Sequence, residues 1–361
     1  MALHFQPLTV ARIEPDTAGA AVITLTVPQA LREAFGFRPG QFLTLRTHIE
    51  GQEVRRSYSI CSTPARLREE GELDVGIKRV DGGVFSNWAL AGLRAGEPLD
   101  VLPPDGRFTP TVAGARHRAG FAAGSGITPL LSIIGTTLAE DPQSRFTLVY
   151  GNQRVDTIMF NEALADLKDR YPDRLTLIHV LSRQPQDVPL LHGRLDAVRV
   201  GELLRTLVPV RFIDEAFVCG PEGMIGATEQ ALQAAGVVRE RIHAERFTAG
   251  GQPAAPTRAR TSAVPQDGPA TELDLIADGK TWHLRLAPGQ RVLEAGLEAG
   301  LDLPYSCRGG VCCTCRAKVL EGSIEMDRNF TLEPQEIAQG FVLTCQAQAT
   351  SARLVVSYDE R

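Results

Sequence analysis

The sequence of 361 residues lacks three features that define other classes of protein. No apolar run approaches the roughly 18 residues that a membrane span requires. The first residues lack the basic region, apolar core and small-residue cleavage site of a secretory leader. A formal net charge of -5 argues against nucleic-acid binding, which normally uses a basic domain or stripe. We therefore expect a cytoplasmic protein that binds neither membrane nor nucleic acid.

Disulfides are not expected in that setting, because cytosolic thiols stay reduced. Seven cysteines are present, so they are better explained as metal ligands or buried thiols. Four of them follow the spacing C-x4-C-x2-C with a distant fourth member: Cys307, Cys312, Cys315 and Cys345. This is the ligand pattern of plant-type [2Fe–2S] ferredoxins. Gly309 and Gly310 remove side chains where the loop backbone must wrap the cluster.

A structural zinc site is the alternative for these cysteines. Zinc sites more often use paired C-x2-C or mixed Cys/His ligands, and no histidine lies near this loop. Cys313 stands directly beside Cys312. Because its neighbours already complete the spacing, we expect Cys313 to be a bystander.

Three segments with different patterns are joined by a linker. Residues 1–112 carry short alternating runs between Gly and Pro residues, which predict a small antiparallel β-barrel. Residues 113–248 alternate strands with helices, which predicts a doubly wound parallel α/β sheet. Residues 249–271 lack apolar periodicity and predict a linker. Residues 272–361 open on an Asp-Gly hairpin and a short helix before the cysteine loop, which predicts an α+β domain.

The elements expected within these segments follow from the runs themselves. In the first segment we expect strands at Ala21–Val27, Phe42–Ile49, Arg55–Cys61 and Leu73–Arg79 and a helix near Phe85–Ala91. In the second we expect strands ending at Ala123 and covering Phe146–Tyr150, Leu175–Leu181 and Ala216–Cys219, with helices at Ile127–Leu138, Asn161–Tyr171, Glu202–Leu207 and Glu222–Ala235.

A flavin site is predicted by two motifs of the barrel. In Arg56-Ser57-Tyr58-Ser59, period-two alternation puts Arg56 and Tyr58 on one face, a guanidinium for phosphate and a ring for a flat cofactor. Gly83-Val84-Phe85-Ser86 opens the expected helix, whose N–H groups favour an anion. An ordinary cross-strand pair and a helix cap at Ser86 are the alternatives. Together the motifs indicate a flavin diphosphate.

A pyridine-nucleotide site is predicted in the second segment. Gly124-Ser125-Gly126-Ile127-Thr128-Pro129 lies between a strand and a helix, and its glycines let a pyrophosphate approach the backbone. A tight turn without a ligand is the alternative. Cys219-Gly220-Pro221 closes another strand, where a small thiol can touch a nicotinamide. A buried hydrophobic cysteine would explain the same residue.

The residues after two of these strands favour NADPH over NADH. No acidic residue ends the strand at Tyr150, where one would bind a ribose 2′-hydroxyl. Instead Asn152 and Arg154 follow that strand, and Ser182 and Arg183 follow the next. Arginine with a hydroxyl suits a 2′-phosphate. Solvated loop charges are the alternative.

Taken in order, these motifs resemble the ferredoxin–NADP reductase superfamily fused to a C-terminal plant-type ferredoxin. The resemblance covers every segment but the linker and implies FAD, a pyridine nucleotide and a β-grasp ferredoxin domain. It implies cofactor contacts at Arg56, Tyr58, Ser59, Gly124, Gly126, Thr128, Cys219 and Gly220. Glu245 and Phe247 resemble residues that close the reactive face of the flavin. Ser59 is the expected partner of flavin N5, so Ser59, Cys219 and Glu245 form the expected catalytic set.

A narrower resemblance concerns the partner. Tyr150 to Phe160, Ile178–Arg183 and Met326–Glu333 resemble the reductase subunit of ring-1,2-phenylacetyl-CoA epoxidase. This resemblance implies transfer of electrons from NADPH through FAD and the cluster to a di-iron oxygenase of phenylacetate breakdown. The alternatives are the reductase of another oxygenase, such as a Rieske-type 3-ketosteroid 9α-hydroxylase, and a redox-sensing interaction protein. Cys313 departs from the family pattern, where a small residue such as glycine is expected.

Overall fold

The computed structural model of the chain describes residues 4–247 and 270–360. It divides into two compact units, one comprising Pro7–Val54 and Tyr58–Arg246, the other Met1–Gln6, Arg55–Ser57 and Phe247–Arg361. The expected linker lies outside the described residues as far as residue 269, and Thr271 already begins a strand. Within the described ranges, no helix has both the length and the apolar character needed to cross a bilayer.

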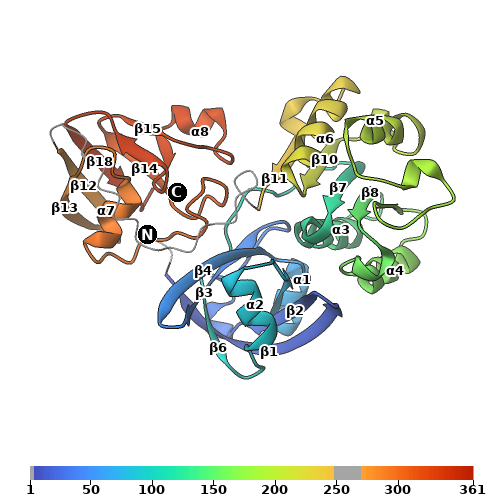
Figure 1. Ribbon diagram of the computed structural model, residues 1–361, viewed down its shortest axis with the longest axis horizontal. Coiled ribbons are helices and arrows are strands. Elements are labelled where there is room, and N and C mark those ends of the chain that lie inside the picture. The colour runs from blue at the N-terminus through green and yellow to red at the C-terminus, as the bar shows by residue number, and fades with distance from the viewer. Residues whose placement is uncertain (1–3, 248–269, 361) are drawn as a thin grey trace. The chain divides into compact units, whose positions relative to one another are not determined.

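The first unit begins with a six-stranded sheet of order β4-β3-β6-β1-β2-β5 (Figure 1). Its strands are β1 Gln6–Thr17, β2 Ala20–Thr26, β3 Phe42–Ile49, β4 Gln52–Ser59, β5 Glu72–Lys78 and β6 Pro98–Val101. β2 pairs antiparallel with both β1 and β5, and β3 pairs antiparallel with β6. An isolated bridge from Ile60 to Val75 links the two edge strands and closes the barrel, which removes its open edges. Helix α2 (Val84–Ala91) packs on the barrel core through Phe85 and Ala89.

A five-stranded parallel sheet of order β11-β10-β7-β8-β9 follows in the same unit. Its strands are β7 His117–Ala123, β8 Arg145–Asn152, β9 Leu175–Leu181, β10 Glu215–Cys219 and β11 Ile242–Glu245. Its helices are α3 Ile127–Glu140, α4 Asn161–Arg170, α5 Ala197–Thr206 and α6 Glu222–Ala234. Phe121 packs in the core with α5 and α6, whereas Ala122 packs with α3 and α4. The sheet is therefore covered on both faces, and its order reverses between β7 and β10, where such sheets bind ligands.

The second unit contains a five-stranded sheet of order β13-β12-β18-β14-β16 and a two-stranded sheet of β15 and β17. Its elements are β12 Thr271–Ala277, β13 Lys280–Leu286, α7 Val292–Glu298, β14 Arg316–Glu321, β15 Ile324–Met326, α8 Pro334–Ala338, β16 Phe341–Leu343, β17 Ala347–Ala349 and β18 Arg353–Ser357. β12 pairs antiparallel with β13 and parallel with β18. Asp278 and Gly279 both have positive φ, as the expected two-residue hairpin requires. This arrangement is the expected β-grasp fold.

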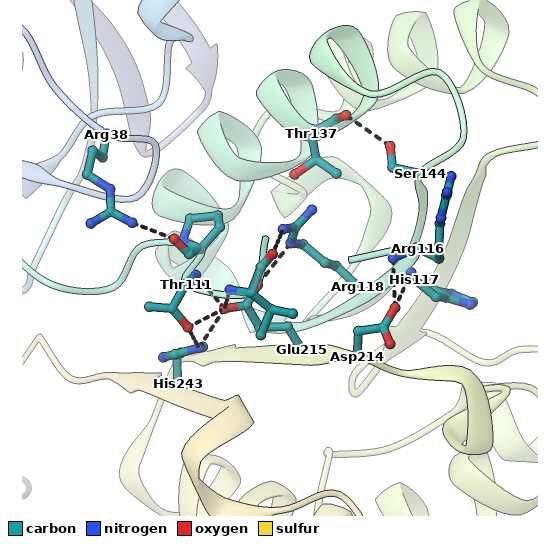
Figure 2. Close-up of polar contacts among 12 residues, drawn as sticks. Arg38, Thr111, Arg116, His117, Arg118, Thr137, Ser144, Asp214, Glu215 and His243 are labelled. Atoms are coloured by element: carbon teal, nitrogen blue, oxygen red, sulfur yellow. Dashed lines mark hydrogen bonds and ion pairs between the residues drawn. The ribbon is translucent and has the colours of Figure 1, made fainter. Parts of the chain in front are cut away.

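The buried carboxylate of Glu215 is hydrogen-bonded both to the segment that follows the barrel and to the parallel sheet (Figure 2). Glu215, at the start of β10, has no exposed surface. It accepts hydrogen bonds from the Thr111 backbone and hydroxyl at 2.7 and 2.9 Å, from Arg118 at 2.9 Å and from His243 at 2.9 Å. Burial alone would raise the pKa of Glu215, but these hydrogen bonds outweigh it and hold the pKa at about 2. The carboxylate is therefore ionised and fully partnered.

Several boundaries differ from the sequence expectations. Helix α5 begins at Ala197 because the Asp196 carboxylate accepts the Arg199 N–H at 2.9 Å and caps the helix; the expected start at Glu202 was wrong. β4 covers Gln52–Ser59 and not Arg55–Cys61. The first and last barrel strands and helix α1 (Pro64–Glu70) were not expected.

Candidate functional site

The four cysteines of the spacing pattern lie together as two pairs of thiols. Cys307 is hydrogen-bonded to Cys312, and Cys315 to Cys345. The pairing of β14 with β16 puts Arg316 opposite Leu343, which brings Cys315 near Cys345. Two thiol pairs fit a cluster of two irons. Among the described residues, no group of three or more His, Cys, Asp or Glu side chains is arranged to hold a single metal ion.

Backbone donors point at these sulfurs. The Cys307 N–H lies 3.5 Å from the Cys312 Sγ, and the Gly309 N–H lies 3.3 Å from the Cys307 Sγ. The hydrogen bond with Cys312, aided by backbone N–H groups, lowers the pKa of Cys307 to about 6. The same hydrogen bond raises the pKa of Cys312, so this pair of thiols shares one proton, which iron binding would displace because thiolates are the form that binds iron. Gly310 has φ 80°, a conformation that side chains disfavour, and a Cβ there would make a tight contact of 3.0 Å with the Arg328 carbonyl oxygen.

Cys313 belongs to the apolar core of this unit. Its side chain is 3% exposed and packs with the buried residues of the sheet. Its backbone has φ 57°, a left-handed conformation in which glycine is the least strained residue. The departure from the family pattern therefore falls at a position where the backbone favours glycine.

The two flavin motifs meet in the barrel. Arg56, Ser57, Tyr58 and Ser59 end strand β4. The Tyr58 ring lies 5.5 Å from the Phe85 ring of α2, between their centroids. Arg56 is half-buried, and its guanidinium donates to the neighbouring Arg55 carbonyl at 2.7 Å. The strand and the helix that were predicted to share one cofactor thus lie against each other.

The N-terminus of α2 depends on a glycine. Gly83 is the N-cap residue, and a Cβ there would lie 2.8 Å from the Ser86 Oγ and 2.9 Å from the Val80 Cβ. Ser86 does not cap the helix: its hydroxyl accepts the Val80 N–H at 3.2 Å. Val84 begins the helix and is exposed. The first N–H groups of a helix lack helical partners, so this end can receive an anion.

The glycine turn and the Cys-Gly-Pro motif lie against each other at the switch point of the parallel sheet. A Cβ on Gly126 would lie 2.1 Å from the Cys219 carbonyl oxygen. Gly124 has φ 54° and follows β7 directly. The Thr128 hydroxyl donates to the Ser125 carbonyl at 3.0 Å and fixes the turn. Gly220 follows β10, and a Cβ there would meet the Met224 side chain at 2.6 Å. The two predicted nucleotide motifs therefore form one surface.

The three residues of the expected catalytic set also come together. Ser59 donates a hydrogen bond of 3.0 Å to the Glu245 carboxyl, and Cys219 lies opposite Glu245 in the pairing of β10 with β11. Burial raises the pKa of Glu245 to about 8, partly opposed by the Ser59 hydrogen bond. Burial also raises the pKa of the Cys219 thiol. The raised pKa values favour a protonated Glu245 carboxyl and a neutral Cys219 thiol, so Ser59 and Glu245 can hold a proton at this end of the sheet.

The residues predicted to select NADPH lie at the carboxyl ends of β8 and β9. The Ser182 and Arg183 N–H groups donate to the carbonyls of Asn152 and Gln153 at 2.9 and 2.8 Å. Asn152 ends β8 and is buried, whereas Arg183 is exposed. Arg154 lies 3.4 Å from Asp156 in an exposed ion pair. The two strand ends are thus joined through their backbones, and Arg183 is accessible to a ligand.

Lys78 is a charged residue of the site that the sequence reasoning missed. It ends β5, and its Nζ lies 3.4 Å from the position a Cβ would take on Gly124. Burial lowers the pKa of Lys78. A cation beside a turn predicted to bind a diphosphate is suited to that ligand. A lysine at a strand end was visible in the sequence, but its approach to residue 124 depends on the fold.

Phe247, the other residue expected at the flavin, is 43% exposed and its role stays a prediction.

Three family models match the chain in succession. They describe an oxidoreductase FAD-binding domain over residues 9–109, an oxidoreductase NAD-binding domain over residues 121–230 and a 2Fe-2S iron-sulfur cluster binding domain over residues 275–350. Each match contains the corresponding motif described above. FAD, NAD(P)H and a [2Fe–2S] cluster are therefore the cofactors of this chain.

Known proteins match over the whole length. The chain is 45% identical over 361 residues to a subunit of the 1,2-phenylacetyl-CoA epoxidase of Escherichia coli K12, covering 99% of this chain and 98% of that protein. It is 35% identical over 353 residues to the ferredoxin reductase component of 3-ketosteroid-9-alpha-monooxygenase of Rhodococcus rhodochrous, covering 97% and 96%. The solved structure of phthalate dioxygenase reductase shares the fold, with a TM-score of 0.60, 22% identity and 98% of each chain covered. The chain therefore belongs to the family of oxygenase reductase components, in which FAD-binding, NAD-binding and 2Fe-2S domains follow one another in one polypeptide.

Proposed function

We propose that this chain passes electrons from NADPH through FAD and a [2Fe–2S] cluster to a di-iron oxygenase that epoxidises phenylacetyl-CoA. The observation that carries the proposal is the 45% identity to the Escherichia coli epoxidase subunit over nearly all of both chains. Identity to the 3-ketosteroid monooxygenase reductase is 35% over a similar length. The second candidate function is therefore that of the reductase of another oxygenase, such as a Rieske-type one.

The bound cofactors supply the redox chemistry, with flavin coupling a two-electron donor to a one-electron cluster. We propose that the residues of this chain bind and orient them. The proposed cluster ligands are Cys307, Cys312, Cys315 and Cys345. Arg56 and Tyr58 hold the flavin, helix α2 holds its diphosphate, and the turn after β7 holds the nucleotide diphosphate beside Lys78. Ser59 and Glu245 hold a proton near the reacting flavin. None of the seven cysteines, all of which the structure describes, forms a disulfide, which fits the reducing cytoplasm we propose as the location.

Reconstitution with two purified oxygenases tests the choice of partner. The chain would be mixed with NADPH and either the oxygenase of the Escherichia coli phenylacetyl-CoA epoxidase or that of the Rhodococcus rhodochrous 3-ketosteroid monooxygenase. We expect product formation coupled to NADPH oxidation with the first and little with the second. Reduction of cytochrome c by the chain alone is the control for an active reductase. The reverse preference in the presence of that activity would refute the proposal.

The proposed preference for NADPH is tested at Arg183. Arg183→Ala is expected to raise the KM for NADPH by about tenfold or more, because a hydrogen bond to a charged group contributes roughly 1.5–3 kcal/mol, and to leave the KM for NADH nearly unchanged. Steady-state kinetics with ferricyanide as acceptor measure both constants. Arg205→Ala, an exposed arginine of α5, is the matched control and should change neither. Equal effects of Arg183→Ala on the two nucleotides would contradict the assignment.

A further inference from the structure

Gln346, which directly follows Cys345, is a buried polar residue of the second unit. It is 2% exposed, and both its neighbours in sequence, Cys345 and Ala347, belong to the apolar core. Its backbone N–H donates to the Leu343 carbonyl at 2.8 Å, and its carbonyl accepts the Asp327 N–H at 3.0 Å. An amide side chain buried in this way is costly unless it is hydrogen-bonded. The hydrogen-bond partners of the side-chain amide therefore explain how a polar residue can be buried here.

The side-chain amide of Gln346 reaches both parts of the ligand set. Its Nε2 donates to the Arg308 carbonyl at 2.8 Å, and Arg308 directly follows Cys307. The same nitrogen lies 2.8 Å from the Cys345 carbonyl oxygen and 3.5 Å from the Cys345 Sγ. One amide nitrogen thus links the cysteine loop to the distant fourth cysteine. Its two N–H groups face three acceptors, so the Cys345 Sγ shares an N–H with one of the two carbonyl oxygens.

A second contact shows that the fit is close. The Gln346 Cγ lies 3.3 Å from the position a Cβ would take on Gly310. Gly310 has φ 80°, so the loop passes close to this glutamine in a conformation that side chains disfavour. The backbone of Arg308 is also left-handed, at φ 50°, where it presents its carbonyl to the amide. The loop conformation and the glutamine side chain are therefore matched.

The position of this N–H has an electrostatic consequence. Reduction adds one electron to the cluster and makes its sulfurs more negative. A fixed N–H dipole directed at a ligand sulfur stabilises the reduced form more than the oxidised form, and hydrogen bonds to sulfur are among the factors that set cluster potentials. Within a buried site this effect is larger than in water.

We propose that Gln346 is a positioning residue that raises the reduction potential of the cluster by donating an N–H to the Cys345 sulfur while it holds the loop through the Arg308 carbonyl. The proposal rests on the cluster and not on the identity of the oxygenase. A glutamine that only filled the core would leave the potential unchanged when replaced by an apolar side chain of similar length.

Gln346→Met in the full-length holoprotein separates these roles, because methionine keeps the length and removes the N–H. We expect iron and sulfide content to stay near wild type and the equilibrium constant for cluster reduction to fall about tenfold, the size of one net hydrogen bond, which is about 59 mV for a one-electron couple. A redox titration followed by the electron paramagnetic resonance of the reduced cluster measures this. An unchanged potential with the cluster retained would overturn the proposal.

Gln348→Met is the matched control. Gln348 lies two residues further along, and its amide donates to the Asp327 carboxylate at 2.7 Å instead of to the cluster loop. Its replacement should leave the potential unchanged, and an equal fall in both variants would count against a specific role for Gln346. If Gln346→Met fails to hold the cluster, Gln346→Asn is measured in the same way. It keeps a polar amide but shortens the reach to the Cys345 sulfur by one methylene, so its potential should also fall, and a wild-type potential would refute the proposal.

Discussion

Replacing Cys345 with alanine is expected to abolish the cluster and with it the transfer of electrons to one-electron acceptors. Cys345 is paired with Cys315 and lies buried at 3% exposure, so no solvent ligand can readily replace its sulfur. Cluster binding couples to folding of the loop, and we expect iron content to fall below about a tenth of wild type. Iron and sulfide analysis and the visible spectrum measure the loss. Reduction of ferricyanide by NAD(P)H should persist, because it can draw on the flavin.

Cys313→Ala provides the control for that experiment. Its side chain is equally buried and is only six positions along the chain from Cys307, but it belongs to neither thiol pair. The cluster should survive this change, and Cys313→Ser, which preserves the volume, should behave in the same way. Loss of visible absorbance in either Cys313 variant would show that the ligand set is wrong.

Gly126→Ala is expected to damage nucleotide binding by forcing two backbone segments apart. An added Cβ would lie 2.1 Å from the Cys219 carbonyl oxygen, 2.6 Å from its carbon and 3.1 Å from the Gly220 nitrogen. All three are backbone atoms, so no side chain can rotate away. Overpacking costs roughly 1–3 kcal/mol, and we expect the KM for NAD(P)H to rise by about tenfold to a hundredfold. Steady-state kinetics measure this, and thermal unfolding shows whether the chain remains folded.

Gly226→Ala serves as the comparison for that variant. Gly226 lies inside helix α6, and a Cβ there would meet nothing within 4 Å. Alanine is the better helix former by about 1 kcal/mol, so stability should be maintained or rise and the KM should not change. A Gly126→Ala enzyme with wild-type kinetics would mean that the turn adjusts freely and does not set the nucleotide site.

Local patterns were enough to predict the parts of this protein that depend on neighbours in sequence. The Asp278-Gly279 hairpin, the helix at Val292 and the parallel strands were expected from turn residues and periodicity, and the structure contains them. The first barrel strand was missed because only Leu8 and Val10 among its residues are fully buried, so its alternation is weak. It is held instead by pairing with β2.

Contacts between distant residues could not be predicted in this way. Gln346 follows a cysteine and resembles any polar residue in the sequence, yet its partner Arg308 is 38 positions away. The approach of Lys78 to Gly124 and the contact of Gly126 with Cys219 likewise depend on how strands are ordered in the folded unit. The motifs predict where the cofactors bind, but only the fold shows which side chains and glycines lie beside those motifs.

The buried Glu215 has a consequence for dividing the protein into separately expressed pieces. The boundary between residues 112 and 113 proposed from the sequence falls directly after two donors to this carboxylate, Thr111 and Val112, whose N–H groups lie 2.7 and 3.3 Å from it. Glu215 is ionised and has no exposed surface. A cut at this boundary would remove some of its hydrogen bonds and destabilise the start of β10. The barrel and the parallel sheet are therefore poor candidates for exchange as independent modules, and chimaeric reductases should inherit both from one parent, together with the segment that joins them.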